Sequence, residues 1–90
     1  LESNYFIGNP FVASDGKHLF VASDFSKKMC VWKKLPDESG AKPDIVYSLE
    51  FQPWDIALFN KTLIIAGEKV ICIWDKLPLN GESPDLTISS

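Results

Sequence analysis

Few side chains in this 90-residue chain have the types and spacing needed for chemistry. His18 is the only histidine, and the two cysteines, Cys30 and Cys72, stand 42 residues apart. No Cys-x-x-Cys or Cys/His spacing indicates a zinc site, and no Gly-x-Ser-x-Gly motif indicates an activated serine. We therefore expect no catalytic residues and no metal ligands, and a chain that is not an enzyme.

The cysteines instead mark a repeat, because each opens nearly the same seven residues, CVWKKLP and CIWDKLP. Three further blocks come into register 41 to 44 residues apart: FVAS with DIAL, KHLFVASD with KTLIIAGE, and PDIVYS with PDLTIS. The spacing shrinks only between blocks, where turns tolerate deletion. We therefore expect a structural repeat carried by Cys30, Trp32, Pro36, Cys72, Trp74 and Pro78.

Each repeat carries four short β-strand signals separated by turn residues, and no segment has helical periodicity. The expected strands are 11–14, 18–23, 29–33, 44–49, 55–58, 62–66, 70–74 and 85–89. Asp15-Gly16 is a hairpin signal between the first two. The strands are apolar on both faces, which indicates a sheet covered on both sides. The fold class is therefore all-β, with two four-stranded antiparallel sheets in the manner of propeller blades.

The blade sequences resemble the NHL-type β-propeller repeat. The resemblance rests on PFVA and WDIA, on LFVASD and LIIAGE, and on CVWKKLP…GAKPDIVYS and CIWDKLP…GESPDLTIS, and it covers essentially the whole chain. The WD-repeat propeller is the rival, since the pair Trp74-Asp75 fits it while the expected Gly-His pair is missing. Blade 1 is expected over residues 1–48, with an N-terminal connector over 1–9, and blade 2 over 49–90.

Two blades would leave both end faces apolar, so further blades must cover them. We expect a ring-shaped homo-oligomer of about six blades, with three copies favoured, four copies or a filament as alternatives, and a glycan or protein as further ligand. The chain opens on Leu1 and its only methionine is Met29, so it can equally be a fragment of a longer propeller.

Ligands of propellers commonly bind at the mouth of the central channel. The residues expected there are Trp54 and Asp55, at the entrance to an innermost strand, and Asp24 and Glu68, at the ends of second strands. The counterpart of Trp54 in the first blade is read as Pro10. Capping of turns is the alternative role for Asp24 and Glu68. A ring of carboxylates on the axis could hold Ca²⁺, as in lactonase-like propeller hydrolases.

The charge and hydropathy of the chain narrow its partners. The net charge is −3, and the basic pairs Lys27-Lys28 and Lys33-Lys34 stand beside acidic residues, so we expect no nucleic-acid partner. No apolar run approaches the roughly 18 residues that span a bilayer, so we expect no membrane partner. A non-catalytic binding or assembly scaffold is therefore the favoured function, and a metal-dependent hydrolase the alternative.

Overall fold

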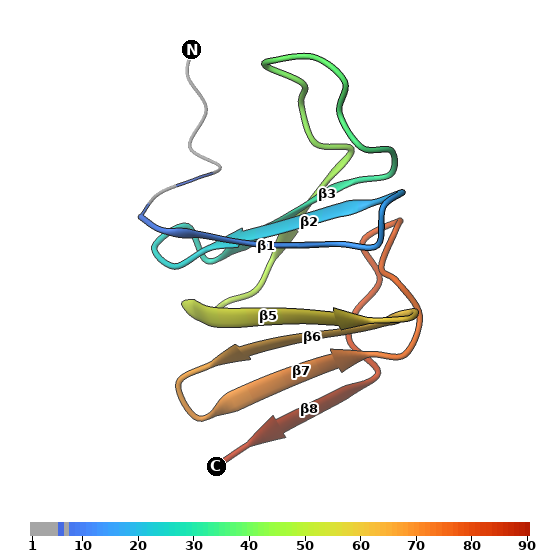
Figure 1. Cartoon of the computed structure of the whole chain (residues 1–90). Coiled ribbons are helices and arrows are strands. Elements are labelled where there is room, and N and C mark those ends of the chain that lie inside the picture. Colours follow the sequence, from blue (N-terminus) through green and yellow to red (C-terminus); the bar gives the residue numbers. More distant parts are fainter. Residues whose placement is uncertain (1–5, 7) are drawn as a thin grey trace.

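Residue 6 and residues 8–90 form β-strands joined by turns and loops, without a helix. The computed structural model describes residue 6 and residues 8–90, so residues 1–5 and 7 of the expected connector lie outside the described residues. Two antiparallel four-stranded sheets stack as layers, with strand orders β1-β2-β3-β4 and β5-β6-β7-β8 (Figure 1). The strands are β1 Pro10–Ser14, β2 Leu19–Ser23, β3 Lys28–Trp32, β4 Ile45–Ser48, β5 Pro53–Phe59, β6 Thr62–Gly67, β7 Val70–Trp74 and β8 Leu86–Ser89.

The expected all-β fold class, with two four-stranded antiparallel sheets in the manner of propeller blades, is confirmed. The boundaries differ by a residue or two at some ends. His18, for example, was expected in a strand and lies in the β1–β2 turn. Its backbone N–H donates to Asp15 Oδ1 at 2.8 Å, and a ring nitrogen lies 2.9 Å from Asp15 Oδ2. These bonds close the turn before β2 begins.

The repeat seen in the sequence is also a repeat of strand register. Leu19 pairs with Trp32 in the first sheet as Leu63 pairs with Trp74 in the second. Cys30 and Cys72 likewise pair with equivalent positions on β2 and β6. Both sheets are simple meanders in which each strand pairs with its neighbours in sequence. The equivalent faces of the two sheets therefore point in the same direction along the stack.

The main core lies between the sheets. The side chains buried there come from β2 and β3 on one side, from β6 and β7 on the other, and from the connector between the sheets. They are Phe20, Ala22, Met29, Val31, Leu49, Leu63, Ile65, Cys72 and Trp74. Complete burial of an apolar side chain of this size contributes roughly 1.5–3 kcal/mol. The stacking of one sheet on the other is thus the main stabilising contact of the chain.

The sheets approach each other most closely along their first strands, where β1 faces β5 (Figure 1). Larger side chains fill the space farther out. The rings of Tyr47 on β4 and Trp74 on β7 meet edge to face, with centroids 5.9 Å apart. The stack is therefore a wedge, tightest along β1 and β5 and spaced by aromatic side chains toward the later strands of each sheet.

The outward face of each sheet is apolar as well. On the first sheet, Val21, Cys30 and Trp32 form a second, smaller core together with Leu19. Phe6 covers part of it, with its ring centroid 6.2 Å from that of Trp32. On the second sheet, Ile71, Leu86 and Ile88 are exposed. The two ends of the stack thus differ in how far the chain covers them.

Candidate functional site

The repeated tryptophans hold the long loop of each blade in place. Trp74 Nε1 donates to the carbonyl oxygen of Glu82 at 2.8 Å, and Trp32 Nε1 donates to that of Ala41 at 3.3 Å. Both indoles are buried. Trp32 and Trp74 therefore pack within the protein and anchor the loop that follows the third strand of each sheet.

Two aspartates that the sequence did not single out complete this arrangement. Asp44 Oδ2 accepts the backbone N–H of Lys33 at 2.8 Å, and Asp85 Oδ2 accepts that of Asp75 at 2.7 Å. The signal was present in the repeated Pro-Asp pairs at 43–44 and 84–85. The prolines of the Leu-Pro turns differ, since Pro78 is buried while Pro36 is exposed. Most of the conspicuous repeated residues thus build the blade.

Both cysteines are free thiols in buried positions, as expected. Burial raises the pKa of the Cys30 thiol to about 11, so it stays protonated and unreactive at neutral pH. Cys72 lies in the core between the sheets, with its Sγ 3.9 Å from Thr87 Oγ1. Because Cys30 and Cys72 occupy the same face of successive sheets, they point in the same direction and do not meet.

The structure brings two of the four expected channel-mouth residues together. Trp54 and Glu68 line one hollow of about 310 Å³ with Lys27, Phe51 and Gln52. This group is hereafter called the Trp54 hollow. Lys27 comes from the β2–β3 turn of the first sheet, and the others come from the connector and the second sheet. The hollow therefore lies where the two sheets meet, at the end where β5 begins.

Asp24 and Asp55 have local roles instead. Asp24 Oδ1 accepts the backbone N–H of Asn9 at 2.9 Å, which is the capping role that the sequence left open for it. Asp55 Oδ1 accepts the N–H of its neighbour Ile56 at 2.9 Å. Neither residue lines the Trp54 hollow.

The reading of Pro10 as the counterpart of Trp54 is wrong. Pro10 pairs with Ser23, and it is Pro53 that pairs with the equivalent Gly67. The register shifts between Pro53 and Asp55, so Trp54 is the extra residue of a β-bulge. A bulge redirects the side chain that it carries, and bulges are frequent beside functional sites. Trp54 is therefore an insertion in β5 relative to β1.

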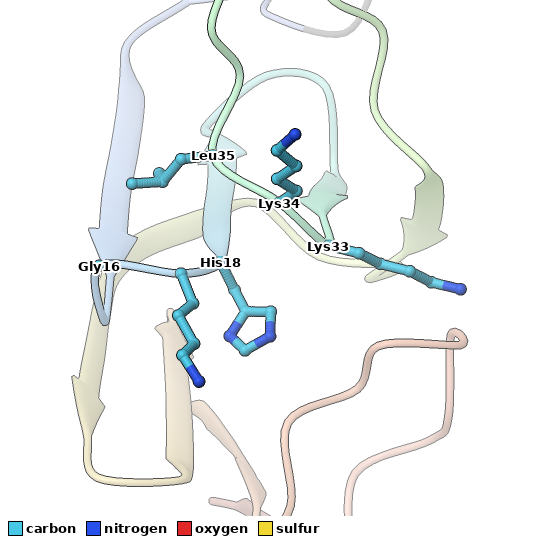
Figure 2. A pocket seen from close by; sticks show the side chains of 6 residues that line it. Gly16, His18, Lys33, Lys34 and Leu35 are labelled. Carbon is cyan, nitrogen blue, oxygen red and sulfur yellow. The ribbon is translucent and has the colours of Figure 1, made fainter.

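A second hollow, of about 450 Å³, carries basic side chains on the opposite end of the first sheet. It is lined by Gly16, Lys17, His18, Lys33, Lys34 and Leu35. Figure 2 shows Lys33 and Lys34 pointing in different directions, and neither points toward the His18 ring. Lys33 Nζ donates to Asn80 Oδ1 at 3.0 Å. The positive charges do not converge, so this hollow lacks the geometry of an anion site.

No group of three or more His, Cys, Asp or Glu side chains that could hold a metal ion occurs among residue 6 and residues 8–90. The same part of the chain contains no helix long and apolar enough to cross a membrane. No protein-family model, no curated protein and no solved structure matches this chain.

Proposed function

We propose that the chain is a non-catalytic assembly scaffold, whose two outward sheet faces bind further copies of the same chain head to tail. One observation carries the proposal. The outward face of the second sheet repeats, position by position, the face that the first sheet buries between the sheets.

The equivalence follows from the strand register. The first sheet packs six apolar positions against the second: the buried Phe20, Ala22, Met29 and Val31, and the partly buried Ile45 and Tyr47. The corresponding outward positions of the second sheet are also all apolar: Ile64, Ala66, Ile71, Ile73, Leu86 and Ile88. Ile88 is 54% exposed and Leu86 is 57% exposed. Exposure of such an apolar face to water is unfavourable, and exposed apolar faces mark interaction surfaces.

The first sheet offers the matching surface. Its outward positions Val21, Cys30 and Trp32 correspond to Ile65, Cys72 and Trp74, which pack against the first sheet inside the chain. Val12 and Val46 on the same face are exposed. Phe6 is the counterpart of Leu49, because Phe6 stands as far before Pro10 as Leu49 stands before Pro53. Leu49 packs in the core between the sheets and Phe6 packs on Trp32, so Phe6 belongs to the outward surface of the first sheet. The contact within the chain is thus a template for the contact between chains.

The two surfaces are unlike, so each copy uses a different surface toward each of its two neighbours. Contacts of this head-to-tail kind close into rings when the rotation per copy divides a full turn. Propellers have four to eight blades, so two blades per copy give closed rings of two to four copies, of which we favour three. The wedge between the sheets, narrow at β1 and β5, supplies the rotation.

Light scattering behind size exclusion over a concentration series tests the proposal. We expect a mass of about three copies that does not change on dilution. Ile88→Lys places a charge on the outward face of the second sheet and should yield a folded single copy, because Ile88 makes no contact in the core between the sheets. Glu38→Lys adds a lysine in the exposed β3–β4 loop and should leave the mass unchanged.

Three outcomes would contradict or change the proposal. A folded single copy at all concentrations would show that the outward faces need no partner. An equal loss of mass with Ile88→Lys and Glu38→Lys would show that net charge, and not the face, controls association. A mass that keeps rising with concentration would replace the ring by an open filament.

A further inference from the structure

The Trp54 hollow carries an inference that is independent of assembly. Its central residue is an insertion, because Trp54 is the extra residue of the bulge between Pro53 and Asp55 and has no counterpart in the regular pairing of β1. Its indole is 56% exposed, unlike those of Trp32 and Trp74. The blade pattern therefore does not require Trp54, and core packing does not account for it.

The hollow has a firm apolar side. Phe51 lies directly on Gly67, so that a Cβ at Gly67 would stand 2.5 Å from Phe51 Cδ2 and 2.8 Å from the carbonyl oxygen of Gln52. Phe51 also packs against the core between the sheets. The chain from Phe51 to Trp54 is thus held on the second sheet through a contact that only glycine allows.

The polar side chains of the hollow include one positive and one negative group, and they can form hydrogen bonds with a ligand. Lys27 supplies an ammonium group, Glu68 a carboxylate and Gln52 a carboxamide. Within residue 6 and residues 8–90, none of these three side chains makes a hydrogen bond or an ion pair. The formal charges of the hollow sum to zero, while donors and acceptors are both present.

We infer that the Trp54 hollow binds the pyranose ring of an uncharged saccharide. A pyranose has a flat face of C–H groups that packs on an indole, and hydroxyl groups that both donate and accept hydrogen bonds. Because Lys27 and Glu68 carry opposite charges, a ligand with a single charge of either sign gains little net Coulomb attraction in this space. Binding sites of this kind combine an aromatic wall with a few placed polar groups.

The equivalent place in the first blade is closed. Asp24, at the position of Glu68, accepts the N–H of Asn9, and the N–H of Asp24 donates back to the carbonyl oxygen of Asn9 at 3.2 Å. Gly8 stands where the second blade has Phe51. Within the described residues, one copy therefore contains one such site, which is complete within the chain whatever its assembly state.

The experiment is a titration of the full 90-residue chain with methyl glycosides of glucose, galactose, mannose and xylose. Tryptophan fluorescence and the indole N–H signals in ¹H–¹⁵N NMR spectra are the readouts. We expect at least one glycoside to shift the Trp54 signal with a Kd in the millimolar range, and to leave the buried Trp32 and Trp74 signals in place. Followed through the backbone N–H signals of Gln52 and Glu68 in the same NMR spectra, Trp54→Ala should weaken binding by at least about tenfold, or 1.4 kcal/mol. Phe59→Ala, which removes an exposed ring from the far end of the same strand, should not change it.

The inference is overturned if no glycoside shifts the Trp54 signal while the chain remains folded. It is also overturned if glycine or inorganic phosphate shifts that signal and the sugars do not, because the site would then select charge. Glu68→Gln keeps the shape of the side chain, removes its charge and replaces one of its two acceptor oxygens by an NH₂ donor, so it tests the role of the carboxylate. If it leaves glycoside affinity unchanged, the assigned role of Glu68 is wrong. None of these readouts depends on the mass of the assembly, so the inference and the proposed ring fail separately.

Discussion

Trp32 and Trp74 occupy the same position in the two sheets, yet their surroundings differ. Trp74 is 1% exposed, lies in the core between the sheets and meets Tyr47 edge to face. Trp32 is 7% exposed, belongs to the smaller core on the outward face and meets the Phe6 ring from the N-terminal segment. The same side chain thus has a whole sheet as its neighbour in one blade and a single described aromatic ring in the other. The repeat thus specifies which side chains form the surface, and the element packed against that surface decides how much the surface contributes to stability.

The largest effect is expected where the neighbour is complete. Trp74→Ala removes a fully buried indole and its hydrogen bond to the Glu82 carbonyl oxygen, and it leaves a cavity in the core between the sheets. We expect a loss of about 3–5 kcal/mol in the free energy of unfolding. Urea unfolding followed by circular dichroism measures it. A loss below that of Trp32→Ala would show that the core between the sheets is not the main stabilising contact.

The matched change on the outward face sharpens the comparison. Trp32→Ala should cost the single chain about 1.5–3 kcal/mol, less than Trp74→Ala, because among the described residues no second sheet packs over this indole. Its second effect should be on association, since Trp32 lies on the face proposed to bind the next copy. Measured by light scattering, the assembled mass should fall, while that of Glu38→Lys stays unchanged. An intact assembly with Trp32→Ala would remove this face from the proposed contact.

The smallest effect is expected away from both cores, in the β1–β2 turn. Hydrogen bonds from the His18 ring, and from the backbone N–H groups of His18 and Lys17, hold the pKa of Asp15 well below its ordinary value of 3.8. A carboxylate with a lowered pKa stabilises the fold above pH 3.8, and this contribution is lost as the pH falls through the lowered pKa. Asp15→Asn should therefore lower the unfolding midpoint slightly at neutral pH. In thermal melts from about pH 7 to about pH 2, the difference from the parent chain should shrink toward the acid end, and a constant difference would mean that the charge is not involved.

Much of the fold followed from the sequence because repetition carries positional information. The four blocks placed all eight strands, and the similar flanks of Trp32 and Trp74 predicted their equivalent packing. The blade signal is strong because a strand that is apolar on both faces must be covered by other elements on both sides. The boundary of β2 differs at His18, because the backbone N–H of His18 donates to the Asp15 side chain in the turn and does not extend the strand pairing.

The candidate site was only half predictable. Trp54 stood out as an aromatic residue at a strand entrance. Its insertion into a bulge changes the repeat spacing by a single residue, and a turn that is one residue longer gives the same change, so the sequence does not reveal the bulge. Lys27 and Gln52 gave no signal, because they lie in a turn and a connector whose approach depends on how the two sheets dock. Asp24 and Glu68 are equivalent in sequence, and only the hydrogen bond from Asn9 separates a cap from a side chain open to a ligand.

The order of the strands has a consequence for how the molecule forms. Among the described residues, every hydrogen-bonded strand pair joins neighbours in the sequence, and the longest loops within a sheet are residues 33–44 and 75–85. Pairing of sequence neighbours lowers the contact order relative to sheets whose strands pair across long connections, and a lower contact order favours faster folding. We expect each meander to zip up from its hairpins, and the docking of one meander on the other, across the connector at residues 49–52, to come last. Until that step is complete, a meander from another copy competes for the same face, so the connector is the natural hinge for exchange of sheets between chains.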